Sequence, residues 1–340
     1  MTSTKRALTA AAFAAALLPS AGRAQALNAA GATFPAPLYT KWFSEYRTRT
    51  GVAINYQAIG SGGGIKNLQE MTVDFGATDG PMSDAEMAAA HGGPIVHIPT
   101  VLGAVTVTYN VPGVPTGLKL TPEVIGAIFN GTLRSWDDAR IRQLNPGVAL
   151  PHRGVIVAHR SDGSGTTYIF TDFLSSASLS WRRAIGTGKA VSWPVGLGGR
   201  GNEGVAGIVK QTPGAIGYVE LAYANQNRLP VAAIRNRAGS FVMPTLASTT
   251  AAAAGVTLPA GSDLRVSIVN GPGAQAYPIA SFTWIIAYTN MRDRAKARAI
   301  GDFLTWALHD GQAYAAGLDY APLPAGVVRL AEQRLRMVQR

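Results

Sequence analysis

Val101-Leu-Gly-Ala-Val-Thr-Val-Thr-Tyr109 and Phe282-Thr-Trp-Ile-Ile-Ala-Tyr288 are two long apolar stretches that decide the fold. Each is too short for a membrane span and is typical of a buried strand. Together they bracket the middle of the chain. If both strands cross between two bodies, the segments outside them form one lobe and the middle forms the other. A two-lobed chain has a cleft between its lobes, which is a common place for a small ligand.

The rest of the chain alternates between predicted strands and helices. Strands are predicted at residues 52–56, 73–77, 95–98, 155–158 and 215–219. Helices are predicted to begin near Ala36-Pro37, Ile65, Ser83, Thr121, Gly165, Asn202, Arg292 and Ala325. Residues 222–276 carry no clear pattern. This alternation favours an α/β fold in which each lobe is a mostly parallel sheet flanked by helices.

We therefore expect residues 27–105 and 282–340 to form one lobe and residues 106–281 to form the other, with the crossover strands acting as a hinge between them. The length of 340 residues and the hydrophobic fraction of 47% are sufficient for packed cores in both.

The first 26 residues predict a cleaved signal peptide. Lys5 and Arg6 precede an uncharged run that is too short to span a bilayer, and Ala24-Gln25-Ala26 has the spacing of a cleavage site. No cysteine follows, so a lipid anchor is not expected. We expect an exported protein that diffuses freely in the periplasm.

Composition excludes several classes of function. The chain has no cysteine, which excludes disulfides, thiol nucleophiles and cysteine-bound metals. The five histidines lack metal-ligand spacing, so neither a metal nor a cofactor is expected. The predicted signal peptide contains Lys5, Arg6 and Arg23 and no acid, so its removal lowers the net charge from +11 to +8. Basic residues are not interleaved with aromatic ones, which argues against nucleic acid as a partner.

Three glycine- and hydroxyl-rich turns each join the end of a predicted strand to the start of a helix. A helix N-terminus offers unpaired N–H donors and a positive dipole end, which suit an anion. Any one of these turns alone is typical of an ordinary helix cap, but three together predict an oxyanion site. They are Ala32-Thr33-Phe34-Pro35, Gly60-Ser61-Gly62-Gly63-Gly64 and Asp162-Gly163-Ser164-Gly165-Thr166.

Three charged residues sharpen that prediction. Arg160 can offer a guanidinium fork to a tetrahedral oxyanion, and Asp162 can orient it, although either could be an ordinary surface or turn residue. Asp79 can accept a hydrogen bond only from an oxyanion that carries a proton. Phosphate carries one at neutral pH and sulfate does not, so Asp79 would discriminate between the two.

Enzyme motifs fit poorly. Ser61 and Ser164 do not lie in a Gly-x-Ser-x-Gly motif. Gly196-x-Gly198-x-x-Gly201 matches a dinucleotide fingerprint, but the stretch before it makes a poor core strand, so we expect a turn and a helix cap there.

Six segments, in order along the chain, resemble the periplasmic phosphate-binding proteins of ABC-type phosphate uptake systems, and the match runs from about Ala29 to the C-terminus. The segments are Gly31–Pro37, Ala58–Ile65, Val73–Asp79, Arg160–Thr166, Trp193–Gly199 and Pro213–Glu220.

The resemblance implies a two-lobed binding protein of type II that is monomeric, is not an enzyme, closes over phosphate and passes it to the permease and ATPase of an ABC importer. It also implies nine phosphate-site residues: Thr33, Phe34, Ser61, Asp79, Arg160, Asp162, Ser164, Gly165 and Thr166. Gly62 departs from the family, where a serine is frequent, and could remove a peripheral hydroxyl.

Two alternatives stay open. The same fold could bind another protonated oxyanion such as arsenate. The chain could also be a secreted phosphatase or hydrolase that uses Ser61 or Ser164 as its nucleophile, although the sequence offers no base or metal beside either serine.

Overall fold

The computed structural model describes residues 26–254, 256, 258–259 and 261–338, so the predicted signal peptide lies outside the described residues except for Ala26. One eight-stranded sheet contains β1 (Ala26–Gly31), β2 (Ala53–Ala58), β3 (Phe75–Thr78), β4 (Ile95–Tyr109), β6 (Ile156–Arg160), β7 (Leu197–Gly199), β8 (Ala215–Glu220) and β11 (Ala280–Tyr288). Their order across the sheet is β2-β1-β3-β11-β4-β8-β6-β7.

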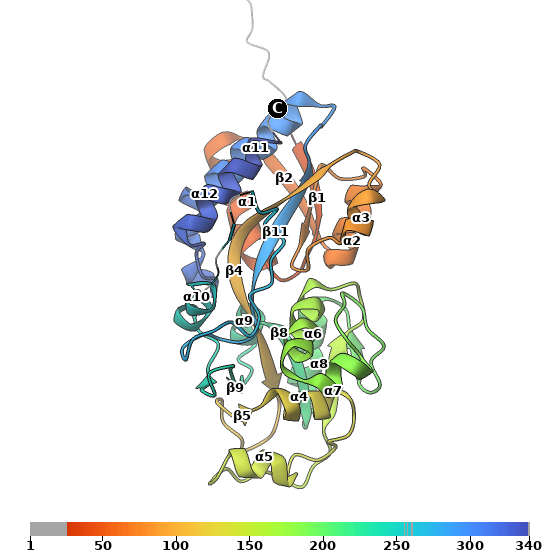
Figure 1. Ribbon diagram of the computed structural model, residues 1–340, viewed down its shortest axis with the longest axis vertical. Helices are drawn as coiled ribbons and strands as arrows, with labels where there is room; N and C mark the ends of the chain where they lie inside the picture. The colour runs from red at the N-terminus through yellow and green to blue at the C-terminus, as the bar shows by residue number, and fades with distance from the viewer. Residues whose placement is uncertain (1–25, 255, 257, 260, 339–340) are drawn as a thin grey trace, which may run out of the picture.

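Strand β4 belongs to two halves of this sheet. Its residues 95–104 pair with β11, and its residues 105–109 pair with β8. We call the half with β2, β1, β3 and β11 lobe I and the half with β8, β6 and β7 lobe II. Figure 1 shows β4 running from one lobe into the other along the long axis of the molecule. The predicted two-lobed architecture with crossover strands is confirmed.

The prediction of separate strands at residues 95–98 and 101–109 was wrong, because these residues form one strand. Pro99 lies within β4 opposite Trp284, and the register shifts between Thr283 and Trp284. Thr100 is therefore the extra residue of a bulge. The bulge lets a proline sit inside a central strand, where a local sequence pattern indicates a break.

Parallel pairing within each lobe also agrees with the prediction. β1 pairs in parallel with β2 and β3, and β6 pairs in parallel with β7 and β8. β11 runs antiparallel to β3, and β4 runs antiparallel to β8. As a result the carboxyl ends of the parallel strands of both lobes meet at the hinge.

Helices cover both faces of the sheet (Figure 1). Lobe I carries α1 (Ala36–Thr50), α2 (Ser61–Gln69), α3 (Asp84–Ala88), α11 (Arg294–Leu308) and α12 (Ala325–Leu335). Lobe II carries α4 (Pro122–Phe129), α5 (Ala139–Leu144), α6 (Gly165–Ala177), α7 (Leu179–Ala184) and α8 (Gly201–Gln211). No helix in these ranges, or elsewhere among the described residues, is long and apolar enough to cross a membrane.

The helix ends follow the predicted caps. Ser83 forms a capping box with Glu86, and the Thr121 hydroxyl accepts from the N–H of Val124. Gly51 ends α1 with a left-handed φ of 77°. Helix α2 is displaced from its prediction, since it begins at Ser61 and leaves Met71 outside, largely exposed.

The segment without a clear sequence pattern contains four short elements and lies beside β4. They are α9 (Leu221–Gln226), β9 (Ala233–Arg235), β10 (Phe241–Val242) and α10 (Leu246–Ala254). β9 joins β10 and β5 (Lys119–Leu120) in a separate three-stranded sheet.

Candidate oxyanion site

The predicted site residues follow the carboxyl ends of strands that lie side by side at the hinge. Thr33 follows β1, Ser61 follows β2 and Asp79 follows β3. In lobe II, Arg160 ends β6, and Ser164 caps the helix that follows. Ligands in open α/β sheets bind at this edge, where loops and helix N-termini converge.

Ser61, Asp79 and Gly165 form one connected group across the junction of the two lobes. The Ser61 hydroxyl oxygen accepts from the N–H of Asp79 at 3.2 Å and from the N–H of Gly165 at 3.0 Å. It also donates to Asp79 Oδ2 at 3.4 Å. On the other side, Thr283 donates to Asp79 Oδ1 at 2.9 Å. A carboxylate of lobe I thus lies directly against the first turn of α6 in lobe II.

Asp79 is almost wholly buried, and its protonation follows from that position. Burial raises the pKa of Asp79 to about 7, against the lowering effects of the Thr283 hydrogen bond, the Arg160 charge and the Ser61 hydrogen bond. A buried carboxyl with a pKa in this range can gain or lose its proton near neutral pH. Such groups are frequent in functional sites.

Arg160 is held as a rigid fork on the lobe II side. Its Nε donates to Asp162 Oδ1 at 2.7 Å and its Nη2 to Asp162 Oδ2 at 2.5 Å. Burial raises the pKa of Asp162, but the hydrogen bonds and charge of Arg160, together with backbone hydrogen bonds that include the one from the N–H of Gly201, bring it below its usual value. The remaining terminal nitrogen, Nη1, donates to the Thr166 hydroxyl at 3.2 Å. Asp162 therefore orients Arg160, as the sequence predicts.

Three tyrosines fix the backbone of the first glycine- and hydroxyl-rich turn. Tyr56, Tyr223 and Tyr320 donate to the carbonyl oxygens of residues 32, 33 and 34 respectively, each at 2.6 Å. In a trans peptide the carbonyl and the following N–H point in opposite directions. Anchoring the carbonyl of residue 33 therefore turns the N–H of Phe34 to the opposite side, as required of the predicted donor.

Glycines let the two lobes approach closely. The N–H of Gly62 donates to the carbonyl oxygen of Gly163 at 2.8 Å. A Cβ atom at Gly62 would lie 3.0 Å from Gly163 Cα. A serine at position 62 would therefore press on the opposite lobe.

Three further residues of this network are not among the predicted site residues: Asn202, Tyr218 and Thr283. Asn202 is fully buried and contacts Thr33 and Thr166. Tyr218 accepts from the N–H of Arg160 at 3.1 Å. The Gly196-x-Gly198-x-x-Gly201 motif directly precedes Asn202. It forms β7 and the turn into α8, with the cap at Arg200.

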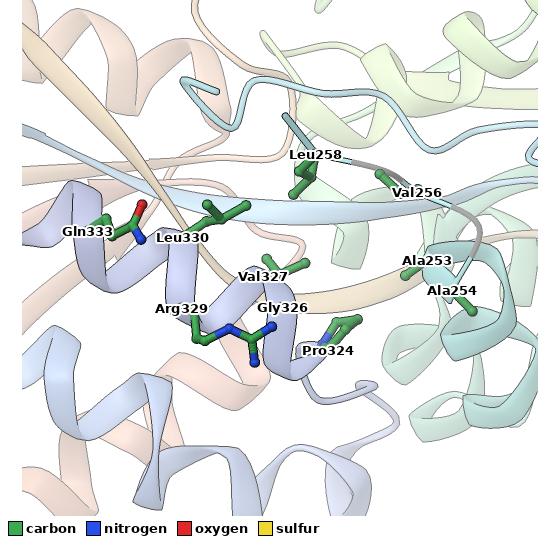
Figure 2. A pocket seen from close by; sticks show the side chains of 10 residues that line it. All are labelled: Ala253, Ala254, Val256, Leu258, Pro324, Gly326, Val327, Arg329, Leu330 and Gln333. Carbon is green, nitrogen blue, oxygen red and sulfur yellow. The ribbon is translucent and has the colours of Figure 1, made fainter. Parts of the chain in front are cut away.

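The pocket in Figure 2 lies elsewhere, between α10 and α12. Its volume is about 410 Å³, and its lining is mostly aliphatic, with Arg329 and Gln333 on α12 as the long polar side chains. None of the residues that line it belongs to the oxyanion network.

Comparison with known proteins agrees with this architecture. Residues 18–310 match the model of the PBP superfamily domain. The phosphate-binding protein PstS of Pasteurella multocida is 42% identical over 308 residues, which are 90% of this chain and 89% of that protein. PstS of Xylella fastidiosa is 41% identical over 307 residues, covering 90% and 84%.

A solved structure described as a high affinity periplasmic phosphate-binding protein, PfluDING, bound with phosphate, matches with a TM-score of 0.71 and 21% identity. The match covers 91% of this chain and 93% of that chain, and it confirms the type II binding-protein fold. The superfamily match and the identity to both PstS relatives show that the chain belongs to the PBP superfamily, in the family of the PstS phosphate-binding proteins.

Proposed function

We propose that this protein binds inorganic phosphate in the cleft between its lobes and delivers it to an ABC-type importer. The observation that carries the proposal is the position of Asp79. A buried carboxylate lies among hydroxyls, helix N-termini and a fixed guanidinium, all of which donate hydrogen bonds. A ligand that fits this set must be an anion with many acceptors and one proton to give, which describes monohydrogen phosphate.

Nine residues take the proposed contacts, divided between the lobes. The lobe I donors are the Thr33 hydroxyl, the Phe34 N–H and Ser61, and Asp79 accepts the ligand proton. In lobe II, Arg160, Ser164, Gly165 and Thr166 donate, and Asp162 supports Arg160. Three hydrogen bonds of 2.5–3.2 Å already join five of these residues, across the lobe junction or within lobe II, which supports a preformed site.

Phosphate would favour closure because it contacts both lobes only when they are together. We propose lobe boundaries at residues 27–105 with 282–340 and at 106–281. In support, β4 changes its pairing partner between Ala104 and Val105, and the pairing of β11 begins at Ala280. The short segment of β4 where the pairing partner changes can act as a hinge about which the lobes rotate.

The further partners proposed are the membrane permease and the ATPase of the importer, and the protein would act as a periplasmic monomer after loss of residues 1–26. The names of the PstS relatives and of the periplasmic structural neighbour support this assignment. Nucleic acid is not among the proposed partners.

Arsenate is the nearest alternative ligand, since its charge, shape and protonation resemble those of phosphate. Hydrolysis of phosphate esters is the alternative of a different class. Ser164 acts as a helix cap, accepting from the N–H of Thr167 at 3.0 Å. Ser61 lies 3.4 Å from the Asp79 carboxylate, so its reactivity needs a direct assay.

Calorimetric titration with phosphate, in parallel with a turnover assay on phosphate esters, tests the proposal. We expect one phosphate bound per chain and no ester turnover. Turnover that is lost in Ser61→Ala would support a hydrolase instead, and tighter binding of arsenate than of phosphate would reassign the ligand.

A further inference from the structure

Asn202 lies where the two lobes meet and contacts a hydroxyl from each. It is the second residue of α8 and is fully buried. Its side-chain nitrogen Nδ2 lies 2.8 Å from Thr33 Oγ1 in lobe I and 3.1 Å from Thr166 Oγ1 in lobe II. One amide group therefore bridges two of the proposed phosphate contacts.

The orientation of this amide is fixed by its other end. Asn202 Oδ1 accepts from the backbone N–H of Glu220 at 2.9 Å. A backbone N–H can only donate, so the side-chain oxygen must face it. The NH₂ group therefore faces Thr33 and Thr166, and it can only donate to them.

Counting donors then fixes the role of each hydroxyl. Thr33 Oγ1 accepts from the Asn202 backbone N–H at 3.2 Å as well as from Nδ2. Thr166 Oγ1 accepts from Arg160 Nη1 at 3.2 Å as well as from the same Nδ2. A hydroxyl has two acceptor positions and one donor. In both threonines the acceptor positions are filled, so each hydroxyl can offer only its proton.

We propose that Asn202 is a positioning residue that fixes the hydroxyls of Thr33 and Thr166 as donors toward the bound oxyanion. This inference rests on the proposed function, because it assigns how that site reads its ligand. A freely rotating hydroxyl can accept a proton from a ligand as well as donate to it. With both hydroxyls fixed as donors, Asp79 is left to accept the ligand proton. The site then becomes more selective for an oxyanion that carries a proton.

A double-mutant cycle separates this role from simple support of α8. Phosphate affinity is measured by calorimetry for the wild type, Asn202→Ala, the pair Thr33→Val with Thr166→Val, and the three changes combined. Asn202→Ala should weaken binding about tenfold or more in the wild type, the scale of a hydrogen bond to a charged group. In the valine background, which has no hydroxyls to orient, the same change should have less than about a threefold effect.

Asn110→Ala is the matched control. Asn110 donates to the carbonyls of Val209 and Lys210 at the other end of α8, each at 3.0 Å, so its loss loosens the same helix away from the cleft. Its phosphate affinity should equal that of the wild type. Asn202→Asp keeps the side-chain size and the acceptor for Glu220 but replaces the donor, so it should also weaken binding about tenfold or more.

Equal losses from Asn202→Ala in both backgrounds would overturn the inference, as would wild-type affinity in Asn202→Asp or in the Thr33→Val, Thr166→Val pair. If Asn202→Ala does not fold, Asn202→Asp and the valine pair still decide. Failure of the wild type to bind phosphate is a different result, because it would overturn the proposed function itself.

Discussion

Asp79, when ionised, differs from the donors around it because a carboxylate can only accept hydrogen bonds. Thr283 and Ser61 occupy part of its acceptor capacity at 2.9 and 3.4 Å. Its remaining lone pairs can take one ligand proton. Against an unprotonated anion, the same carboxylate is a source of repulsion.

Asp79→Asn should therefore reduce selectivity for phosphate over sulfate, because an amide can donate to sulfate and no longer repels it. We expect the dissociation constant for sulfate divided by that for phosphate to fall about tenfold or more, the equivalent of one charge-assisted hydrogen bond. The measurement is a competition titration with both anions.

Asp172→Asn is the control, since Asp172 also accepts from a hydroxyl, that of Ser267 at 2.5 Å, but lies outside the oxyanion network. Selectivity that is equal in Asp79→Asn and the wild type would contradict the role of Asp79.

The raised pKa of Asp79 also predicts how stability depends on pH. The pKa rises from 3.8 in the unfolded chain to about 7 in the fold. A raised carboxyl pKa stabilises the fold fully below the unfolded value, and this contribution is lost as pH increases to 7. Without ligand, the wild type should lose on the order of 3 kcal/mol of stability from this group between pH 4 and pH 7.

Glu220 is buried and its pKa is also raised, so it too lowers the stability as the pH rises. Its contribution is the same in the wild type and in Asp79→Asn. The test is thus the difference in unfolding free energy between the wild type and Asp79→Asn, measured by denaturant titration at several pH values. This difference should change with pH, and a constant difference would show that Asp79 is not perturbed.

Residues at or just after the end of a strand, beside a glycine-containing turn, such as Ser61, Asp79 and Arg160, could be anticipated from sequence because turn, cap and charge are local signals. Thr283 and Asn202 could not. Thr283 contacts Asp79 across 204 positions of sequence, and Asn202 contacts Thr33 across 169. Their roles depend on which strands are neighbours in the sheet, which no local pattern records.

At the scale of elements, the N-terminus of α6 packs directly against the loops of lobe I. A Cβ atom at Gly165 would lie 2.5 Å from both Asp79 Oδ2 and Ser61 Oγ. Because both are site groups in the opposite lobe, a side chain at this position separates the lobes at their point of contact.

Gly165→Ala should accordingly weaken phosphate binding by about 100-fold or more, since it prevents closure and removes contacts from one whole lobe. Its thermal stability should stay within a few degrees of the wild type, because opening relieves the clash. Gly207→Ala in α8 is the control, as a Cβ there has no neighbour within 4 Å. Wild-type affinity in Gly165→Ala would show that closure does not need this close approach.

Elements with strong local signals were predictable, and those that depend on distant pairing were not. Pro37, Thr121 and Gly51 mark helix ends as expected. The continuity of β4 depends on the bulge opposite β11, and the short strands β9 and β10 are stabilised by each other and by β5. The local sequences of β9 and β10 resemble loops, so their strand conformation depends on pairing with neighbouring strands.

At the scale of the whole molecule, an ion pair joins the two lobes. Lys189 in lobe II lies 2.8 Å from Glu86 on α3, and it also donates to the carbonyl of Pro81 at 2.9 Å. Because opening separates these charges, they stabilise the closed form.

Lys189→Ala should increase the rate of phosphate release by about three- to tenfold, the scale of a partly buried ion pair, while the association rate changes little. Stopped-flow measurements at low and high salt should show this effect shrinking as salt screens the wild-type pair. Lys41→Ala is the control, because Lys41 pairs with Glu45 within α1. Equal release rates in Lys189→Ala and the wild type would exclude a role for this pair in closure.

The measurement that tests the central claim most directly is a calorimetric titration of the purified protein with phosphate in a large excess of sulfate. The account predicts one phosphate per chain, with an affinity that sulfate changes less than about twofold, because the cleft requires a proton for Asp79. Absence of saturable phosphate binding, or displacement of phosphate by sulfate at similar concentrations, would contradict it.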